Sequence, residues 1–257
     1  MSSDTSALAA SHHMQVDFVS SKPKKVLIVV ANPATATTVG WPVGFWAAEL
    51  THPYFEFTER GVQVTIASPE GGKVEFDALS DPRDASKWSA NDLISMGFIN
   101  TPELMALLED TPRLADLDLG EYDALMVAGG LAPMWTFRDD ASLKAAIRHF
   151  YEAEKPTAAY CHGTSALVDI KLSDGSYLVN GKTVTGFANV EEDYSDAFAG
   201  QTIMPWRLED AFRERGANYV QAGLFKAFVV RDGRLITGQQ QYSSRKVAEA
   251  VIETLGV

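Results

Sequence analysis

The chain's single cysteine lies in the stretch Ala158-Ala159-Tyr160-Cys161-His162-Gly163-Thr164-Ser165-Ala166. Apolar residues before it predict a buried strand over Thr157–Tyr160, and the residues after Gly163 predict a helix over 164–170. A strand-to-helix turn holds a thiol on a sharp bend, aimed away from the sheet. The amides at a helix start also favour a thiolate over a thiol. We therefore predict a strand–turn–helix unit with a reactive cysteine at its turn.

A buried structural cysteine is the alternative interpretation, because packing is the commoner role of an isolated cysteine. The adjacent His162 and the turn-forming Gly163 favour the reactive interpretation instead. A thiol nucleophile needs a group that takes its proton, and His162 is the only histidine close to Cys161 in the sequence. His162 is therefore the candidate base, although a residue adjacent to the thiol can also turn away and only pack.

Further predicted strands and helices alternate along the chain on both sides of this unit. Continuous apolar runs predict strands covered on both faces at 26–31, 62–67 and Ala124–Val127. Apolar spacings of three and four predict helices over 43–60 and around 143–150, 208–216 and 247–255. This alternation predicts an α/β fold with a doubly wound, mostly parallel sheet flanked by helices. Ligands of such sheets bind beyond the carboxyl ends of the strands.

Turn residues predict how the remaining segments connect. Asn180-Gly181 and Asp232-Gly233 predict hairpins over 177–185 and 228–236. The long polar excursion over 68–119 is typical of a loop that serves an active site. Residues 24–257 are expected to form one domain, and residues 1–23, with weak periodicity, a flexible N-terminal tail.

Composition excludes several classes of function. Twenty-two basic against 34 acidic residues leave a formal charge of −12, which repels nucleic acid and anionic membranes. One cysteine allows neither an internal disulfide framework nor a multi-cysteine metal site. No apolar run is long enough to span a bilayer, and no signal-peptide core is recognisable. We expect a cytoplasmic protein without nucleic-acid, membrane or metal partners.

Three other features are candidates for the site. Gly129-Gly130 follows a predicted strand and is a plausible source of oxyanion-hole amides, although a plain turn fits equally well. Glu49 lies in an apolar run, where a carboxylate is either solvated or has a raised pKa, and its spacing favours the solvated interpretation. The cluster Glu191-Glu192-Asp193 is typical of a solvated loop.

Taken together, these motifs resemble the ThiJ/PfpI superfamily. The resemblance rests on Gly44-Phe45-Trp46-Ala47-Ala48-Glu49, Ala128-Gly129-Gly130 and Cys161-His162-Gly163. Two further segments, 67–72 and 184–192, resemble its larger, glyoxalase III-like branch, which also includes heat-inducible chaperones. The similarity covers roughly 24–256. It implies a flavodoxin-like, class I glutamine amidotransferase-like sandwich that forms homodimers.

The resemblance also implies roles by position. Cys161 matches the family's reactive cysteine, His162 its triad histidine and Glu192 the acid that orients that histidine. Glu49 matches a protonated glutamate that hydrogen-bonds the thiolate. Gly130 and the residue after it match the oxyanion amides.

One departure from the family pattern concerns the substrate pocket. The branch usually has Gly-Gly-His-Gly at this strand end, whereas this chain has Gly129-Gly130-Leu131-Ala132. An apolar side chain thus replaces a polar one. Trp46 and Trp135 are candidates for a more apolar pocket, with core packing as the favoured alternative.

The resemblance implies a cofactor-independent cysteine enzyme that converts a 2-oxoaldehyde such as methylglyoxal to a 2-hydroxy acid. One alternative keeps the nucleophile but acts as a hydratase or amidase/protease on another small electrophile, such as an isocyanide, and Leu131 favours this alternative somewhat. Another is a stress chaperone or redox sensor whose cysteine reports oxidation.

Overall fold

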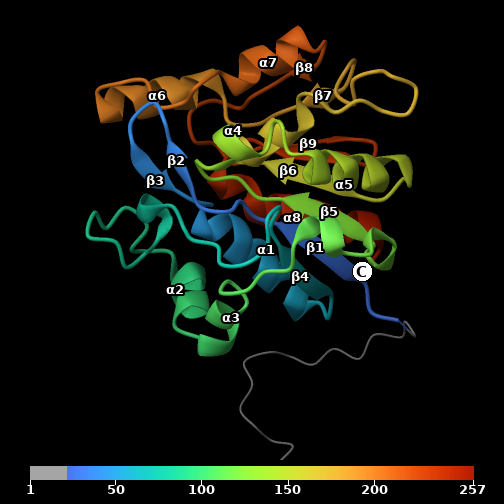
Figure 1. Cartoon of the computed structure of the whole chain (residues 1–257), viewed down its shortest axis with the longest axis horizontal. Coiled ribbons are helices and arrows are strands. Elements are labelled where there is room, and N and C mark those ends of the chain that lie inside the picture. The colour runs from blue at the N-terminus through green and yellow to red at the C-terminus, as the bar shows by residue number, and fades with distance from the viewer. Residues whose placement is uncertain (1–21) are drawn as a thin grey trace, which may run out of the picture.

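A six-stranded sheet with strand order β4-β1-β5-β6-β10-β9 runs through the molecule (Figure 1). The computed structural model describes residues 22–257, so the predicted tail over 1–23 lies outside the described residues except for its last two. The sheet strands are β1 (Lys25–Val29), β4 (Gln63–Ala67), β5 (Ala124–Val127), β6 (Thr157–Tyr160), β9 (Val229–Asp232) and β10 (Leu235–Gly238).

Every neighbouring pair in this sheet is parallel except β9 with β10, which confirms the prediction of a mostly parallel sheet. The continuous apolar runs arise because both faces are covered. Within β1, Leu27 and Val29 enter one core and Val26 and Ile28 enter the other. Successive residues of β1 thus pack into opposite cores, so neither face of the strand is polar.

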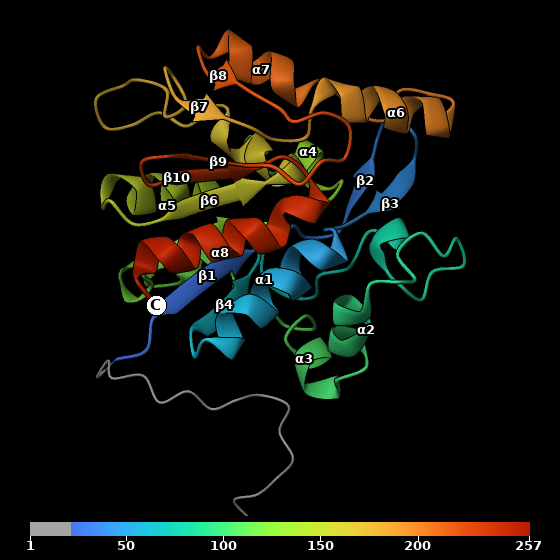
Figure 2. The same ribbon diagram turned by 180° about the vertical axis from the view of Figure 1, so that it is seen from behind.

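Helices flank both faces of the sheet, as expected of a doubly wound fold. Helices α1 (Ala47–Glu59) and α8 (Ser244–Leu255) cover one face, which lies toward the viewer in Figure 2. Helix α5 (Ala141–Glu152) and the short α4 (Pro133–Thr136) pack on the other face. Asp140 begins α5 as its N-cap, since its side chain accepts a hydrogen bond from the Leu143 amide.

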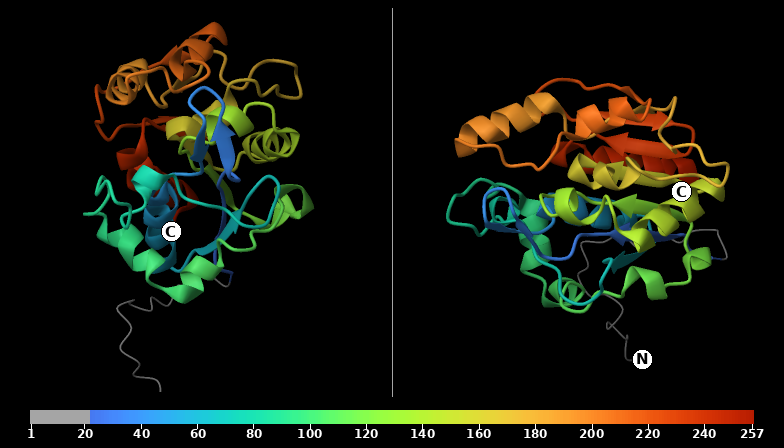
Figure 3. Two further views of the ribbon diagram at one scale, coloured as in Figure 1. Left: turned by 60° about the vertical axis from the view of Figure 1, so that its left-hand side comes forward. Right: turned by 45° about the horizontal axis from the view of Figure 1, so that its top comes forward.

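The remaining elements lie around the sheet. Helices α6 (Asn189–Ala199) and α7 (Leu208–Glu214), orange in Figure 3, form an outer layer of the molecule. Strands β7 (Thr183–Val184) and β8 (Asn218–Tyr219) pair as a short ribbon, and α7 packs beside β8. Strands β2 (Ala34–Ala36) and β3 (Trp41–Val43) pair separately, and α2 (Leu93–Ile99) and α3 (Pro102–Ala106) belong to the long excursion after β4. Short 3₁₀ turns span Ala78–Ser80, Leu114–Asp116, Leu119–Glu121, Cys161–Leu167 and Gln241–Ser243.

One predicted hairpin is confirmed and the other is wrong. Strands β9 and β10 pair antiparallel around Asp232-Gly233, as predicted. Over 177–185, however, β7 pairs in parallel with the distant β8, and the Gly181 amide donates to the Gly216 carbonyl at 2.9 Å. The Asn-Gly signal describes a tight turn correctly, but long-range pairing decides which strand lies next to it. None of the helices within 22–257 has the length and apolar character needed to cross a bilayer.

Glycines allow the loops after β5 and β6 to touch. A Cβ on Gly163 would meet the Val127 carbonyl oxygen at 2.6 Å, and a Cβ on Gly129 would meet the Cys161 Cβ at 2.8 Å. Side chains are thus excluded where the loop after β5 crosses the turn after β6, and this contact sets the spacing of the cysteine turn.

We predict that Gly163→Ala destabilises the fold by about 1–3 kcal/mol, the usual penalty for overpacking against backbone. Gly97→Ala is the matched control, because Gly97 lies inside α2 with nothing within 4 Å of an added Cβ. That variant is expected to gain about 0.5–1 kcal/mol from helix propensity. Urea unfolding measures both, and equal free energies of unfolding for Gly163→Ala and the unmodified protein would contradict the close-contact argument.

Candidate active site

Cys161 lies on a strained turn at the carboxyl end of β6. Its backbone has φ of 55°, a left-handed conformation that a residue with a side chain adopts only under structural constraint. The chain leaves β6 at Tyr160 and enters a 3₁₀ turn over Cys161–Leu167, where the sequence predicted a helix over 164–170. The predicted strand–turn–helix unit is therefore present, with a tighter helical segment that starts at the cysteine itself.

Glu49 lies in the first turn of α1 and is fully buried, so the solvated interpretation is wrong. Its Oε2 accepts a hydrogen bond from the Gly129 amide at 2.7 Å, and its carboxyl interacts with the Cys161 thiol. Burial raises the pKa of Glu49 to about 8. At neutral pH this carboxyl therefore holds a proton.

The pKa of the Cys161 thiol differs from the expectation, because the turn geometry predicted a favoured thiolate. Burial, and next the negative charge of Glu49 when it is ionised, raise the pKa of Cys161 well above its ordinary value. The amides of Gly130 and His162 act in the opposite direction, as the turn geometry predicted, but they are the weaker influence. Cys161 and Glu49 are thus two buried, adjacent acids that titrate as a pair, and repulsion keeps both from ionising together.

His162 connects the thiol to a second buried carboxylate. Its Nδ1 lies 3.9 Å from the Cys161 Sγ, and its Nε2 lies 3.0 Å from Glu192 Oε1. The ring also packs on Phe187, with 4.2 Å between ring centroids. The imidazole is held on three sides, and its alignment places a proton acceptor between sulfur and carboxylate.

Glu192 is buried in the first turn of α6, so the prediction of a solvated acidic loop is wrong for it and for Glu191. Glu191 accepts hydrogen bonds from the Ala188 amide at 2.9 Å, the Phe225 amide at 3.0 Å and the Gln239 side chain at 2.7 Å. Burial raises the pKa of Glu191 to about 7. Glu191 thus anchors the start of α6, and the next residue along the helix reaches His162. Nothing in the local sequence distinguishes this pair from a surface cluster.

Two of the amides expected to form an oxyanion hole beside the thiol already donate hydrogen bonds to carboxyls. The Gly129 amide donates to Glu49, and the Leu131 amide donates to Asp77 Oδ2 at 2.7 Å, so neither is free to hold an oxyanion in this structure. The Gly130 amide, in contrast, interacts with the sulfur, as does the His162 amide. The oxyanion role of Gly129, Gly130 and Leu131 therefore stays a prediction, since buried carboxyls accept the hydrogen bonds of the first and the last of these amides.

Asp77 is a site residue that sequence reasoning missed. It is buried in the long excursion after β4 and also accepts from the Gly44 amide at 2.8 Å, which joins this loop to the segment before α1. Burial raises the pKa of Asp77 to about 6. A lone aspartate in a polar loop carries no sequence signal of such a role. Within 22–257, no three or more His, Cys, Asp and Glu side chains gather in a way that could hold a metal ion.

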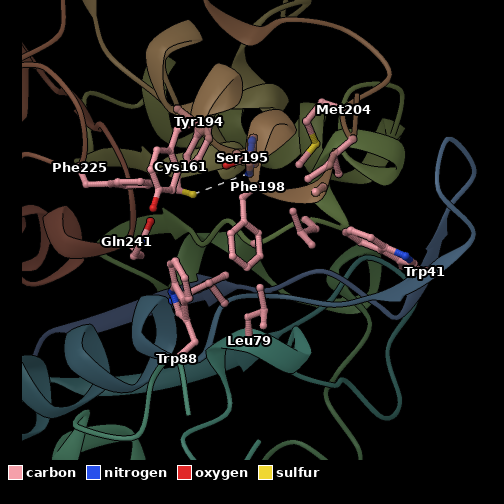
Figure 4. Close-up of a pocket in the computed structure, with 17 residues that line it drawn as sticks. Trp41, Leu79, Trp88, Cys161, Tyr194, Ser195, Phe198, Met204, Phe225 and Gln241 are labelled. Atoms are coloured by element: carbon pink, nitrogen blue, oxygen red, sulfur yellow. Dashed lines mark hydrogen bonds between the residues drawn. The ribbon is translucent and has the colours of Figure 1, made fainter. Parts of the chain in front are cut away.

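A cavity of about 130 Å³ opens beside Cys161 and His162 (Figure 4). The Leu131 side chain lines it, as does Trp46, whereas Trp135 lies elsewhere with its indole nitrogen 3.2 Å from the Thr37 hydroxyl. The other walls come from the β3 strand, the long excursion, α6 and the loop after it: Trp41, Leu79, Trp88, Tyr194, Ser195, Phe198, Ala199, Ile203 and Met204. Gly130, Phe187, Phe225 and Gln241 complete the lining.

Comparisons with known proteins agree with this architecture. A glutathione-independent glyoxalase of Schizosaccharomyces pombe is 31% identical over 222 residues, which cover 83% of this chain and 88% of that protein. The solved structure of the rapid encystment protein of Francisella tularensis superposes with a TM-score of 0.82 at 29% identity and covers 90% of this chain and 99% of that one. The structure of glyoxalase III from Candida albicans has a TM-score of 0.76 at 24% identity and covers 90% and 96%.

The family model described as DJ-1/PfpI matches residues 39–254, a span that contains Glu49, Cys161, His162 and Glu192. With the sheet order, the cysteine turn and the similarity to several relatives in agreement, the chain belongs to the DJ-1/PfpI family.

Proposed function

We propose that the protein is a glutathione-independent glyoxalase that converts a 2-oxoaldehyde, R–CO–CHO, and water to a 2-hydroxy acid. The observation that carries the proposal is the buried chain Cys161–His162–Glu192 beside a protonated Glu49, at the inner end of a cavity. Relatives that are named glutathione-independent glyoxalases support it, with 25–31% identity over most of this chain.

The geometry fits a sequence of proton transfers centred on His162. The Cys161 thiol gives its proton to His162, and the sulfur adds to the aldehyde carbon C1. The imidazolium returns this proton to the aldehyde oxygen, which completes a hemithioacetal and leaves His162 neutral. His162 then takes the proton from C1 and gives it to the C2 oxygen, which forms an enediol; it next takes the C1 hydroxyl proton and gives it to C2, which yields a thioester. Water hydrolyses the thioester and releases the 2-hydroxy acid and the free thiol.

The two buried glutamates have different parts in this scheme. Glu49, protonated at neutral pH, adds no negative charge beside the thiolate and offers it a hydrogen bond. Glu192 holds the His162 ring in position through Nε2 and stabilises its positive charge after proton transfer. One carboxyl thus offers a proton to the sulfur and the other positions the imidazole, so the two have different roles in the acid–base chemistry.

No metal or cofactor has a part in this scheme. We also propose that the protein forms a homodimer, as the family resemblance implies, and that it acts in the cytoplasm. The hydratase, amidase/protease and chaperone or redox-sensor alternatives stay predictions.

Cys161→Ser tests the nucleophile. A serine hydroxyl is far harder to ionise than a thiol, so conversion of methylglyoxal to lactate without glutathione is expected to fall to the uncatalysed rate. The variant keeps the size of the side chain, and its thermal unfolding should match that of the unmodified protein. Lactate formation at the original rate by a folded Cys161→Ser protein would remove the covalent mechanism.

Glu49→Leu and Glu49→Gln test the protonated carboxyl. Without a donor beside the sulfur, the alkylation rate of Cys161 by iodoacetamide at pH 7 should fall about tenfold to a hundredfold in Glu49→Leu, the range for a hydrogen bond to a charged group. Glu49→Gln keeps a donor and should lose less. Above pH 8 the unmodified Glu49 ionises and repels the thiolate, so the difference from Glu49→Gln should change there. Identical pH profiles for all three proteins would exclude Glu49 from the site.

Glu192→Gln tests the positioning of His162. A misaligned imidazole transfers protons poorly but leaves the cavity walls intact, so kcat is expected to fall about 100-fold or more with KM nearly unchanged. Asp193→Asn is the matched control, since the neighbouring Asp193 side chain is 73% exposed and pairs only with Arg207 at 3.1 Å. Equal decreases of kcat in the two variants would contradict a specific positioning role of Glu192, because they would show that loss of either negative charge in α6 lowers kcat.

A further inference from the structure

Aromatic and aliphatic side chains make up most of the wall of the active-site cavity. Three tryptophans line it, Trp41, Trp46 and Trp88, together with the aromatic side chains of Tyr194, Phe187, Phe198 and Phe225 and the aliphatic side chains of Leu79, Leu131, Ile203 and Met204. None of the lining residues is Asp, Glu, Lys or Arg. Such a wall stabilises an apolar group and leaves the polar atoms of a small hydrated aldehyde without partners.

The polar groups of the cavity are concentrated at the reacting end. Cys161 and His162 lie at the inner end, where a carbonyl would be attacked. In Figure 4, Trp88 and Leu79 lie across the cavity from Cys161, and Phe198 lies between Cys161 and these two side chains. A substrate with its aldehyde at the sulfur therefore directs its other end toward aromatic rings.

Trp88 and Phe198 together close the outer side of this wall. Trp88 comes from the long excursion after β4 and Phe198 from α6, and their ring centroids lie 5.5 Å apart at an interplanar angle of 59°. The two residues remain 44% and 65% exposed, so water surrounds them until something covers the rings. Large exposed apolar side chains at a cavity mouth indicate a binding surface, since their burial by a ligand is favourable.

The volume is suited to one aromatic ring. The cavity measures about 130 Å³, and an apolar protein cavity of about 150 Å³ binds benzene. Flat rings also match a wall of tryptophan and phenylalanine better than a methyl group does, because aromatic pairs gain from edge and offset contacts.

We propose that the cavity selects 2-oxoaldehydes with an aryl substituent, of which phenylglyoxal is the simplest, over methylglyoxal. The inference rests on the proposed glyoxalase function and names the substrate class of the same site. The chemistry is unchanged: phenylglyoxal and water give mandelate, with the same C1-to-C2 proton shift and the same release of the thiol. The phenyl group occupies the space between Leu131, Trp88 and Phe198.

Turnover of the two aldehydes by the full chain is the first test, with mandelate and lactate measured by chromatography. The kcat/KM for phenylglyoxal is expected to exceed that for methylglyoxal at least tenfold. Because the two aldehydes differ in intrinsic reactivity, the change of this ratio in variants is the sharper measure. Trp88→Ala and Leu131→His should each lower the ratio at least threefold. Leu93→Ala, at a position 79% exposed in α2 and outside the cavity, should leave it unchanged.

A binding test that needs no turnover separates this inference from the proposed function. Acetophenone and acetone carry the same contrast of substituents without an aldehyde. Acetophenone should slow the alkylation of Cys161 by iodoacetamide, read by peptide mass spectrometry, whereas acetone at equal concentration should not. The protection should weaken in Trp88→Ala and persist in Leu93→Ala.

The outcomes distinguish the two claims. Efficient methylglyoxal turnover with an unchanged ratio in Trp88→Ala and Leu131→His, and equal protection by both ketones, would overturn the aryl preference and leave the glyoxalase proposal standing. Selective protection by acetophenone without turnover of either aldehyde would overturn the glyoxalase proposal and support an aryl-binding cavity.

Discussion

The hydrogen bond from the Gly129 amide to the buried carboxyl of Glu49 is the contact on which the site depends. It joins the loop after β5 to the first turn of α1, next to the turn that carries Cys161. Gly129 has no side chain, and a Cβ there would collide with the Cys161 Cβ, so only a glycine brings the amide this close. The carboxyl consequently lies beside the sulfur in the interior of the protein, and burial holds its proton at neutral pH.

Buried carboxyls organise the rest of the site in the same manner. Asp77 accepts the amides of Gly44 and Leu131, and Glu191 accepts those of Ala188 and Phe225. Each carboxyl satisfies backbone donors from two segments, which is how a loop-rich edge of a parallel sheet avoids unpaired buried amides. The same pattern places the Leu131 side chain, the start of α6 and Phe225 around one cavity.

Acid–base groups and substrate-binding groups come from different parts of the fold. The thiol and the residues that adjust its protonation follow β5 and β6 or begin α1 and α6, where rigid elements meet. Much of the apolar wall comes from the excursion after β4, from β3 and from the exposed side of α6. Variation in these peripheral segments changes the cavity without disturbing the chemistry, in accordance with the general separation of scaffold and binding loops.

The sequence by itself determined the features that depend on neighbouring residues. The apolar runs of β1 and β5, the Asp140 cap of α5, the β9–β10 hairpin and the strained turn at Cys161 all arise from local patterns, and the fold class followed from their order. A motif resemblance added roles for Glu49 and Glu192 that their local sequence did not indicate.

Only the tertiary structure decided which of these side chains are buried and which amides are already bonded. Glu49 and Glu192 have the sequence surroundings of solvated residues and become buried because α1 and α6 pack over the cysteine turn. The amides of Gly129 and Leu131 are occupied by carboxyls 80 and 54 residues away. The predicted hairpin over 177–185 failed for the same reason, since β7 pairs with β8. Burial and pairing between distant segments depend on the packed whole, and no local pattern encodes them.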